Sequence, residues 1–246
     1  MRTLDEASWA GVVRATGLDG AGVPLRPLGH DHAGGGPAEP ALVEAAALAL
    51  GRADVGLTVM SGTGERGVLA QLGSDQHALG VAIRAVVAGD AGPVAVPGVR
   101  LGAHAPGQLT REVMRLVPPG GEERRLPRGP VTLDQEAALI AGRTAVSDPD
   151  VALAAVRHAG LEDVPPVLQA LARGTSASVT MTVSTGGGPL HAVRQWLLTD
   201  RGWVSLTVRG RRVTHTASSR AELTAATTSM LAGAWDAALV ARERAS

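Results

Sequence analysis

The sequence contains no cysteine, which excludes disulfide bonds, thiol nucleophiles and thiolate-ligated metal sites. It also contains no phenylalanine, tyrosine, lysine or asparagine, and only two isoleucines, Ile83 and Ile140. Because these residues share codons rich in A and T, their joint scarcity indicates a GC-rich genome. Without Phe and Tyr, the core must be built from Leu, Val, Ala, Met and four Trp. Without Lys, a Walker-type phosphate loop is impossible.

An excess of charge of either sign is also missing. Lys+Arg and Asp+Glu both total 23, so the formal net charge is zero. The chain therefore lacks the basic footprint of phosphate-backbone binding and the polybasic excess that attracts anionic membranes. Hydrophobic residues make up 45%, which is enough for a proper core and argues against global disorder.

Long hydrophobic runs are absent as well. The segment 1–9 lacks the charged start and apolar stretch of a signal peptide. No uninterrupted apolar run approaches the roughly 20 residues that span a bilayer. The sequence therefore predicts a cytosolic location.

The hydrophobic pattern predicts an α+β protein with two pseudo-repeated halves, about 1–120 and 130–246, separated by a Pro- and Gly-rich linker at 118–130. Each half begins with helices, continues as an antiparallel β-meander and closes with a helix, and both halves can share one central sheet. The whole chain, 1–246, is then a single domain. Three capping boxes are expected to open helices: Thr3 with Glu6, Thr132 with Gln135, and Ser219 with Glu222. The expected strands are 55–60, 67–72, 78–87 and 94–101, then 178–184, 190–199, 203–208 and 212–216.

Two short polar segments are expected to be hairpin turns. The first is Gly73–Ser74–Asp75–Gln76, whose small polar residues are typical of a surface loop. The second is Asp200–Arg201–Gly202, between two strand-like runs.

Three glycines, Gly62, Gly64 and Gly67, match the spacing of a dinucleotide fingerprint. That fingerprint requires the third glycine to open a helix, and here another strand-like run follows at once. A glycine-rich hairpin is therefore the preferred interpretation, with nucleotide binding as the alternative.

Other candidates for chemistry have simpler explanations. His30, Asp31 and His32 could supply metal ligands, but zinc needs three or four convergent ligands, and a solvated linker at 29–36 is preferred. No GxSxG nucleophile motif is present. The adjacent carboxylates Asp5/Glu6, Glu122/Glu123 and Glu162/Asp163 are interpreted as caps and solubilising groups. No catalytic residue, cofactor or metal site is predicted.

Four large apolar residues have two interpretations. Trp196 and Trp203 flank the Asp200–Gly202 turn, while Leu231 and Trp235 lie on the last expected helix. They can be core residues that replace the missing Phe and Tyr, which general burial tendencies favour. They can also be partner contacts, since Trp is enriched at interface hot spots.

Three segments, in this order, resemble the EspG family of chaperones of type VII secretion in actinobacteria. The first runs from Leu4-Asp5-Glu6-Ala7-Ser8-Trp9 to Val23-Pro24-Leu25-Arg26-Pro27. The second is Ala49–Val59 with Gln76–Arg84, and the third is Trp196–Val204 followed by the C-terminal helix. The ordered set spans most of the chain, although none of the segments is diagnostic alone.

The resemblance implies a cytosolic chaperone, not an enzyme, that keeps helical PE/PPE- or WxG-like secretion substrates soluble and delivers them to the secretion machinery. It implies that the client's apolar tip contacts the sheet, the 73–76 turn and the helical region 219–239. A nucleotide-binding enzyme and a structural homodimer remain alternatives. The implied partner contacts are Gly73, Ser74, Asp75, Gln76, Trp196, Trp203, Leu231 and Trp235.

Overall fold

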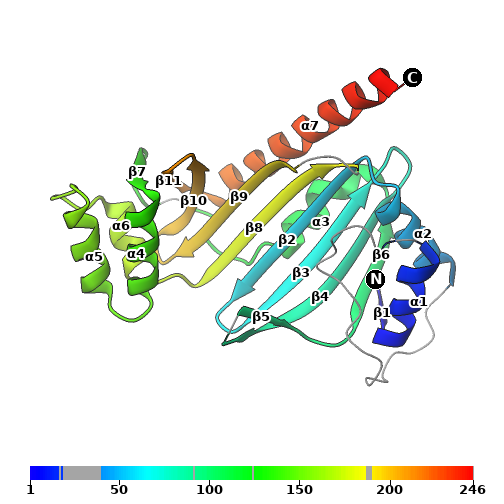
Figure 1. Ribbon diagram of the computed structural model, residues 1–246, viewed down its shortest axis with the longest axis horizontal. Helices are drawn as coiled ribbons and strands as arrows, with labels where there is room; N and C mark the ends of the chain where they lie inside the picture. Colours follow the sequence, from blue (N-terminus) through cyan, green and yellow to red (C-terminus); the bar gives the residue numbers. More distant parts are fainter. Residues whose placement is uncertain (17, 19–39, 91, 124, 187–189, 246) are drawn as a thin grey trace. The chain divides into compact units, whose positions relative to one another are not determined.

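A computed structural model describes residues 1–16, 18, 40–90, 92–123, 125–186 and 190–245 (Figure 1). The expected linker at 29–36, with its His30-Asp31-His32 motif, lies outside these residues, as does the Val23–Pro27 part of the first EspG-like segment. The α+β prediction is confirmed, because the described residues form seven α-helices and an eleven-stranded antiparallel sheet. The helices are α1 (Glu6–Thr16), α2 (Pro40–Gly51), α3 (Leu109–Leu116), α4 (Gln135–Ala145), α5 (Pro149–His158), α6 (Pro166–Ala172) and α7 (Arg220–Ala245).

The strands follow the predicted meanders closely. Hydrogen bonding joins them in the order β1-β6-β4-β3-β2-β8-β9-β10-β11-β7, with β5 paired to β4. Two short strands, β1 and β7, were missed by the sequence analysis. The bounds are β1 (Arg2–Leu4), β2 (Val55–Thr63), β3 (Arg66–Ser74), β4 (Leu79–Gly89), β5 (Gly92–Ala95), β6 (Val99–His104), β7 (Pro130–Asp134), β8 (Ala177–Thr185), β9 (Leu190–Thr199), β10 (Gly202–Arg209) and β11 (Arg212–Ser218).

The chain divides into two compact units. Unit 1 contains 1–117, 181–193 and 227–246, and unit 2 contains 118–180 and 194–226. Strands β8 and β9 and helix α7 contribute residues to both. The predicted pseudo-repeat of two sequence halves is not confirmed. Among the described residues, no helix combines the length and apolar character needed to cross a membrane.

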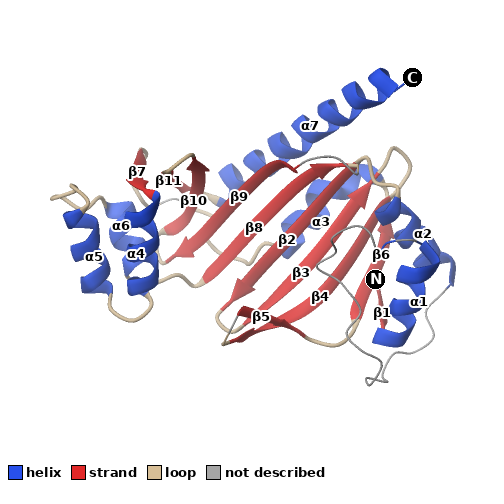
Figure 2. Ribbon diagram, in the orientation of Figure 1, coloured by secondary structure: helices blue, strands red, loops and turns tan. Residues whose placement is uncertain are grey.

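Unit 1 has helices on both faces of its strands (Figure 2). Helix α2 packs on β3, β4 and β6. Gly73 and Gly80 allow this close approach, since a Cβ added at Gly73 would lie 2.9 Å from the Leu50 Cα. On the opposite face, the Ser61 hydroxyl donates to the Leu116 carbonyl at the end of α3 (2.6 Å). Alternation along each strand therefore gives unit 1 two packed faces.

Unit 2 places α4, α5 and α6 on the strands β9, β10, β11 and β7 (Figure 1). Its apolar cluster joins helix residues to inward-facing strand residues such as Val204 and Ala217. Helix α5 starts at Pro149, because Asp148 accepts hydrogen bonds from the amides of Asp150 and Val151, and proline suits the first helical turn.

Of the three predicted capping boxes, one is confirmed. The Ser219 hydroxyl accepts from the Glu222 amide (3.2 Å), and the Glu222 carboxylate accepts from the Ser219 amide (2.7 Å). The other two are wrong. Asp5 caps α1 in place of Thr3, accepting from the Ser8 amide (2.7 Å), and Asp134 caps α4 in place of Thr132. Both misassigned threonines belong to short strands, β1 and β7, directly before the helices.

Candidate functional site

The turn between β3 and β4 is built around Asp75. Its Oδ1 accepts from the amides of His77 and Ala78, both at 2.7 Å. The Ser74 hydroxyl is fully buried and lies 3.2 Å from the carbonyls of Asp75 and Ala78. Burial raises the pKa of Asp75, but the two amide hydrogen bonds and the nearby charges of His77 and Arg242 outweigh it, so this pKa lies below its usual value.

The expectation that the 73–76 segment is wholly a surface loop is therefore wrong for half of it. Gly73 and Ser74 are buried, Asp75 is half-buried, and Gln76 is exposed. Gly73 belongs to β3, where the backbone of α2 lies against it, and Ser74 ends the same strand. Their role is to hold α2 and the turn in place, which leaves Asp75 and Gln76 as the accessible residues.

The large apolar residues proposed as partner contacts are mostly core. Trp196 and Trp203 retain at most 1% exposure, and the Trp203 indole donates to the Gly120 carbonyl (2.8 Å). Leu231 is also buried, whereas Trp235 is half-buried. The core interpretation is therefore correct for Trp196, Trp203 and Leu231. A Trp whose indole is buried and hydrogen-bonded cannot contact a partner without rearrangement of the core.

Unit 1 presents an open area of sheet on the side that carries α2. Leu69 and Gln71 share this side with Gly73 because they alternate with it along β3, and their partners in β2 are Met60 and Thr58. Met60 is 41% exposed and the other three are half-buried. We call these four residues the β2–β3 face. None of them carries a charge.

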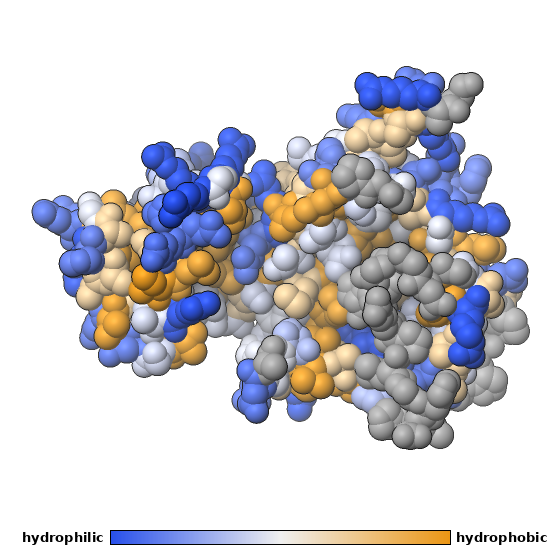
Figure 3. Space-filling model, viewed as in Figure 1, coloured by the Kyte–Doolittle hydropathy of each residue, from blue (hydrophilic) through white to orange (hydrophobic). Residues whose placement is uncertain are grey.

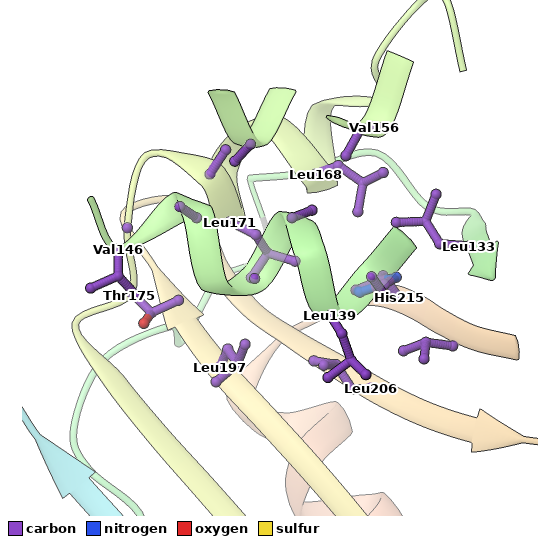
Figure 4. Close-up of a pocket in the computed structure, with 18 of the residues that line it drawn as sticks. Leu133, Leu139, Val146, Val156, Leu168, Leu171, Thr175, Leu197, Leu206 and His215 are labelled. Carbon is purple, nitrogen blue, oxygen red and sulfur yellow. The ribbon is translucent and has the colours of Figure 1, made fainter. Parts of the chain in front are cut away.

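Unit 2 contains an apolar cleft of about 640 Å³ between its helices and its strands (Figure 4). Figure 4 shows Thr175 beside Val146 at one end and His215 beside Leu139 at the other. Apolar residues also appear on the surface where α4 and α6 lie (Figure 3). Arg173 is the one charged residue among those that line the cleft, and Leu139 and Val146 at its rim are 52% and 90% exposed.

A row of neighbouring residues forms the strand side of this cleft. Gln195 of β9 pairs with Leu206 of β10, and Leu206 pairs with His215 of β11. His215 is only 5% exposed, and its Nδ1 has no hydrogen-bond partner among the described residues. Burial lowers the pKa of His215, partly opposed by a hydrogen bond to the Val131 backbone, so the imidazole is neutral near pH 7.

The glycine motif is a hairpin, as preferred from the sequence. Gly62 pairs with Gly67 in the β2–β3 ladder, and Gly64 adopts φ 56° in the turn. Gly67 is thus a strand residue and opens no helix, so this segment lacks the helix N-terminus that binds a pyrophosphate in the dinucleotide fold. The part of the chain that the structure describes also contains no group of three or more His, Cys, Asp or Glu that could hold a metal ion.

Two features were missed from the sequence. The first is a buried ion pair between Glu6 and Arg84, whose partners are 78 residues apart. Glu6 had been interpreted as a helix-capping residue because acidic residues are common in the first helical turn. The second is the cleft at His215, a residue to which the sequence alone assigned no role. Two sequence features could have indicated this cleft: a histidine in a strand of alternating polarity, and small residues in the helices. Only the fold brings these features together.

No protein-family model matches this chain, and no curated protein matches it. The EspG resemblance therefore stays a prediction.

Proposed function

We propose that this chain is a chaperone that binds helical PE/PPE- or WxG-like substrates of a type VII secretion system and keeps them soluble before export. The ordered resemblance to the EspG family supports this proposal. The structural observation that carries it is the β2–β3 face, an uncharged and partly exposed area of sheet.

The composition of the β2–β3 face suits a protein partner. Interface centres are depleted of charged residues and enriched in Met, and this face combines Met60 and Leu69 with the hydrogen-bonding side chains of Thr58 and Gln71. The apolar side of a client helix would cover Met60 and Leu69, and its polar edge would reach Gln71. Such a contact removes apolar surface from water, at about 25 cal/mol per Å².

The β3–β4 turn and helix α7 supply the other proposed partner contacts. Asp75 and Gln76 are the accessible residues of the turn, and Trp235 is the partly accessible member of the proposed α7 contacts. Further along α7, Leu239 and Val240 are 46% and 44% exposed. Exposed apolar residues of this kind are common on protein surfaces singly, so they support the proposal only alongside the β2–β3 face.

The test is co-expression with a small helical substrate of a type VII secretion system, followed by affinity purification. The Met60→Arg variant should lose the substrate from the purified complex, because the new charge would be buried at the contact without a partner. Val94→Arg is the matched control: Val94 is also an exposed apolar strand residue (54%), but it lies on β5 and outside the proposed face.

The parent protein and Val94→Arg should both retain the substrate, and all three proteins should melt at similar temperatures. Equal retention by Met60→Arg would reject the β2–β3 face as the contact. Failure of the parent protein to hold any such substrate in soluble form would reject the chaperone proposal itself.

A further inference from the structure

We propose that the apolar cleft of unit 2 is a binding site for a small, neutral amphiphile with a hydroxyl head group, such as a fatty alcohol or a neutral acylglycerol. The hydroxyl donates a hydrogen bond to the imidazole of His215, and the alkyl chain lies between the helices and the strands. This site is separate from the β2–β3 face, and its test does not depend on the chaperone proposal.

The size and lining of the cleft fit such a ligand. Small-molecule sites are concave, about 300–1,000 Å³ in volume, and mainly apolar with a few placed polar groups. The cleft has about 640 Å³ and is lined by residues such as Leu139, Leu168, Leu171 and Leu206. In Figure 4 these leucines surround the space between α4 and the strands. A chain of methylene groups would replace water along this lining, and each buried methylene would strengthen binding.

His215 determines the polarity of the head group. His215 lines the cleft and is only 5% exposed. Its neutral imidazole has one donor and one acceptor nitrogen, and the head-group hydroxyl donates to the acceptor nitrogen. An acceptor left without a partner in such a site is unfavourable. A ligand that donates one hydrogen bond at this point removes that cost, whereas an ether or ester oxygen cannot.

The charges of the cleft argue against an ionised head group beside His215. Arg173 is the one charged residue of the lining and is exposed on the loop that follows α6. Figure 4 places Thr175, two residues further on, at the end of the cleft away from His215. A carboxylate near His215 would thus be buried without a cation, at a cost of several kcal/mol. The neutral alcohol avoids this cost.

The experiment uses the full chain and two probes that differ by one donor: decanol and decyl methyl ether. Titration calorimetry should show decanol binding about five- to tenfold more tightly than the ether, which is the usual value of one hydrogen bond. In His215→Leu this preference should disappear, with the affinity for the ether unchanged or slightly higher. In Ala138→Phe, which fills the cleft from α4, neither probe should bind.

Each outcome decides the proposal. Circular dichroism melting establishes that both variants fold, and His215→Leu alone suffices if Ala138→Phe does not. Absence of decanol binding to the parent protein rejects the site. Equal affinity for decanol and the ether, or a preference for decanol that survives in His215→Leu, rejects the hydrogen bond to His215. Tighter binding of decanoate than of decanol would place the head group at Arg173 and would also overturn the proposal.

Discussion

Glu6 of unit 1 and His215 of unit 2 are both buried polar side chains, but their hydrogen bonding differs. In unit 1 the carboxylate of Glu6 accepts hydrogen bonds from Arg84 and from the Gly98 amide (2.8 Å), so opposite charges are buried together. In unit 2, His215 is buried among apolar residues, and its Nδ1 has no described partner. Glu6 and Arg84 join α1 to β4, whereas His215 lines a cleft and has an unpartnered Nδ1. Asp54 Oδ2 and His104 Nε2 of unit 1 are likewise buried without a described partner.

The difference indicates where in the molecule a ligand-binding site is expected. A buried polar network whose members hydrogen-bond to one another stabilises one structure. Removal of one member leaves its partner buried and unpaired, which greatly lowers the free energy of unfolding. A buried polar atom without a partner inside the protein is a cost that a ligand can remove. By this reasoning, Glu6 and Arg84 are structural, and the cleft that His215 lines is our proposed binding site. The predictions below test this contrast, in order of decreasing expected effect.

The largest effect is expected from Glu6→Ala in unit 1. The substitution leaves the fully buried Arg84 without its carboxylate, and breaking a buried ion pair in this way typically costs 3–5 kcal/mol. Urea denaturation followed by circular dichroism should show this loss in the free energy of unfolding.

The double variant Glu6→Leu/Arg84→Met is the control. It removes both charges and keeps apolar volume, so it should be far less destabilised than Glu6→Ala. A double variant as unstable as the single one would mean that packing, and not the unpaired charge, causes the loss.

A smaller effect is expected from Asp75→Ala in the β3–β4 turn. The variant loses the two hydrogen bonds to the amides of His77 and Ala78, which resembles the loss of a helix cap and should cost about 1 kcal/mol. Gln76→Ala is the control: Gln76 is exposed, and its loss should change stability by less than about 0.5 kcal/mol.

The Asp75 contribution should also depend on pH. Since the folded state lowers the pKa of Asp75, its stabilisation is present above the ordinary aspartate pKa and is lost as pH falls through the folded value. The difference in the free energy of unfolding between the parent protein and Asp75→Ala should therefore shrink in acid. A constant difference down to about pH 2 would show that the carboxylate charge is irrelevant to the turn.

The sequence predicted most of the fold, because the signals for strands and turns are local. The eight strands expected from alternation and glycine-rich turns overlap nine of the eleven described strands, because the segment 94–101 covers both β5 and β6. Strands β1 and β7 were missed since three to five residues carry too short an alternation, and both pair only with distant strands. Their presence also explains the two wrong caps, at Thr3 and Thr132.

The candidate sites were harder to predict than the fold. Burial of Ser74 depends on how α2 packs on β3 and β4, which no local pattern reveals. Glu6 has the same sequence context as a solvent-exposed capping residue, and only the β4 arginine makes it a core residue. The cleft requires α4, α5 and α6 to be placed on β9–β11, so its residues are scattered over more than 80 positions of the chain. Long-range packing therefore limits prediction of sites more than prediction of elements.

The smallest effect is expected at His215, and it appears only in acid. At neutral pH the imidazole is uncharged in both the folded and the unfolded chain, so it contributes little to the pH dependence. As pH falls through about 6.5, the unfolded chain takes up a proton that the folded chain resists, because burial lowers the pKa of His215. The free energy of unfolding should therefore decrease from neutral pH toward the folded pKa and should stop decreasing from this source below it.

The measurement is urea denaturation of the parent protein and His215→Leu at about pH 7.5 and about pH 5.5. The other six histidines are present in both proteins, so the difference between the two reports His215 alone. His215→Leu should lose less stability than the parent protein between the two values, and saturating decanol should make the parent protein's loss steeper, since the alcohol binds the neutral imidazole. Equal losses in both proteins would show that the structure rearranges so that burial no longer opposes protonation of the His215 imidazole. The contrast between Glu6 and His215 would then fail.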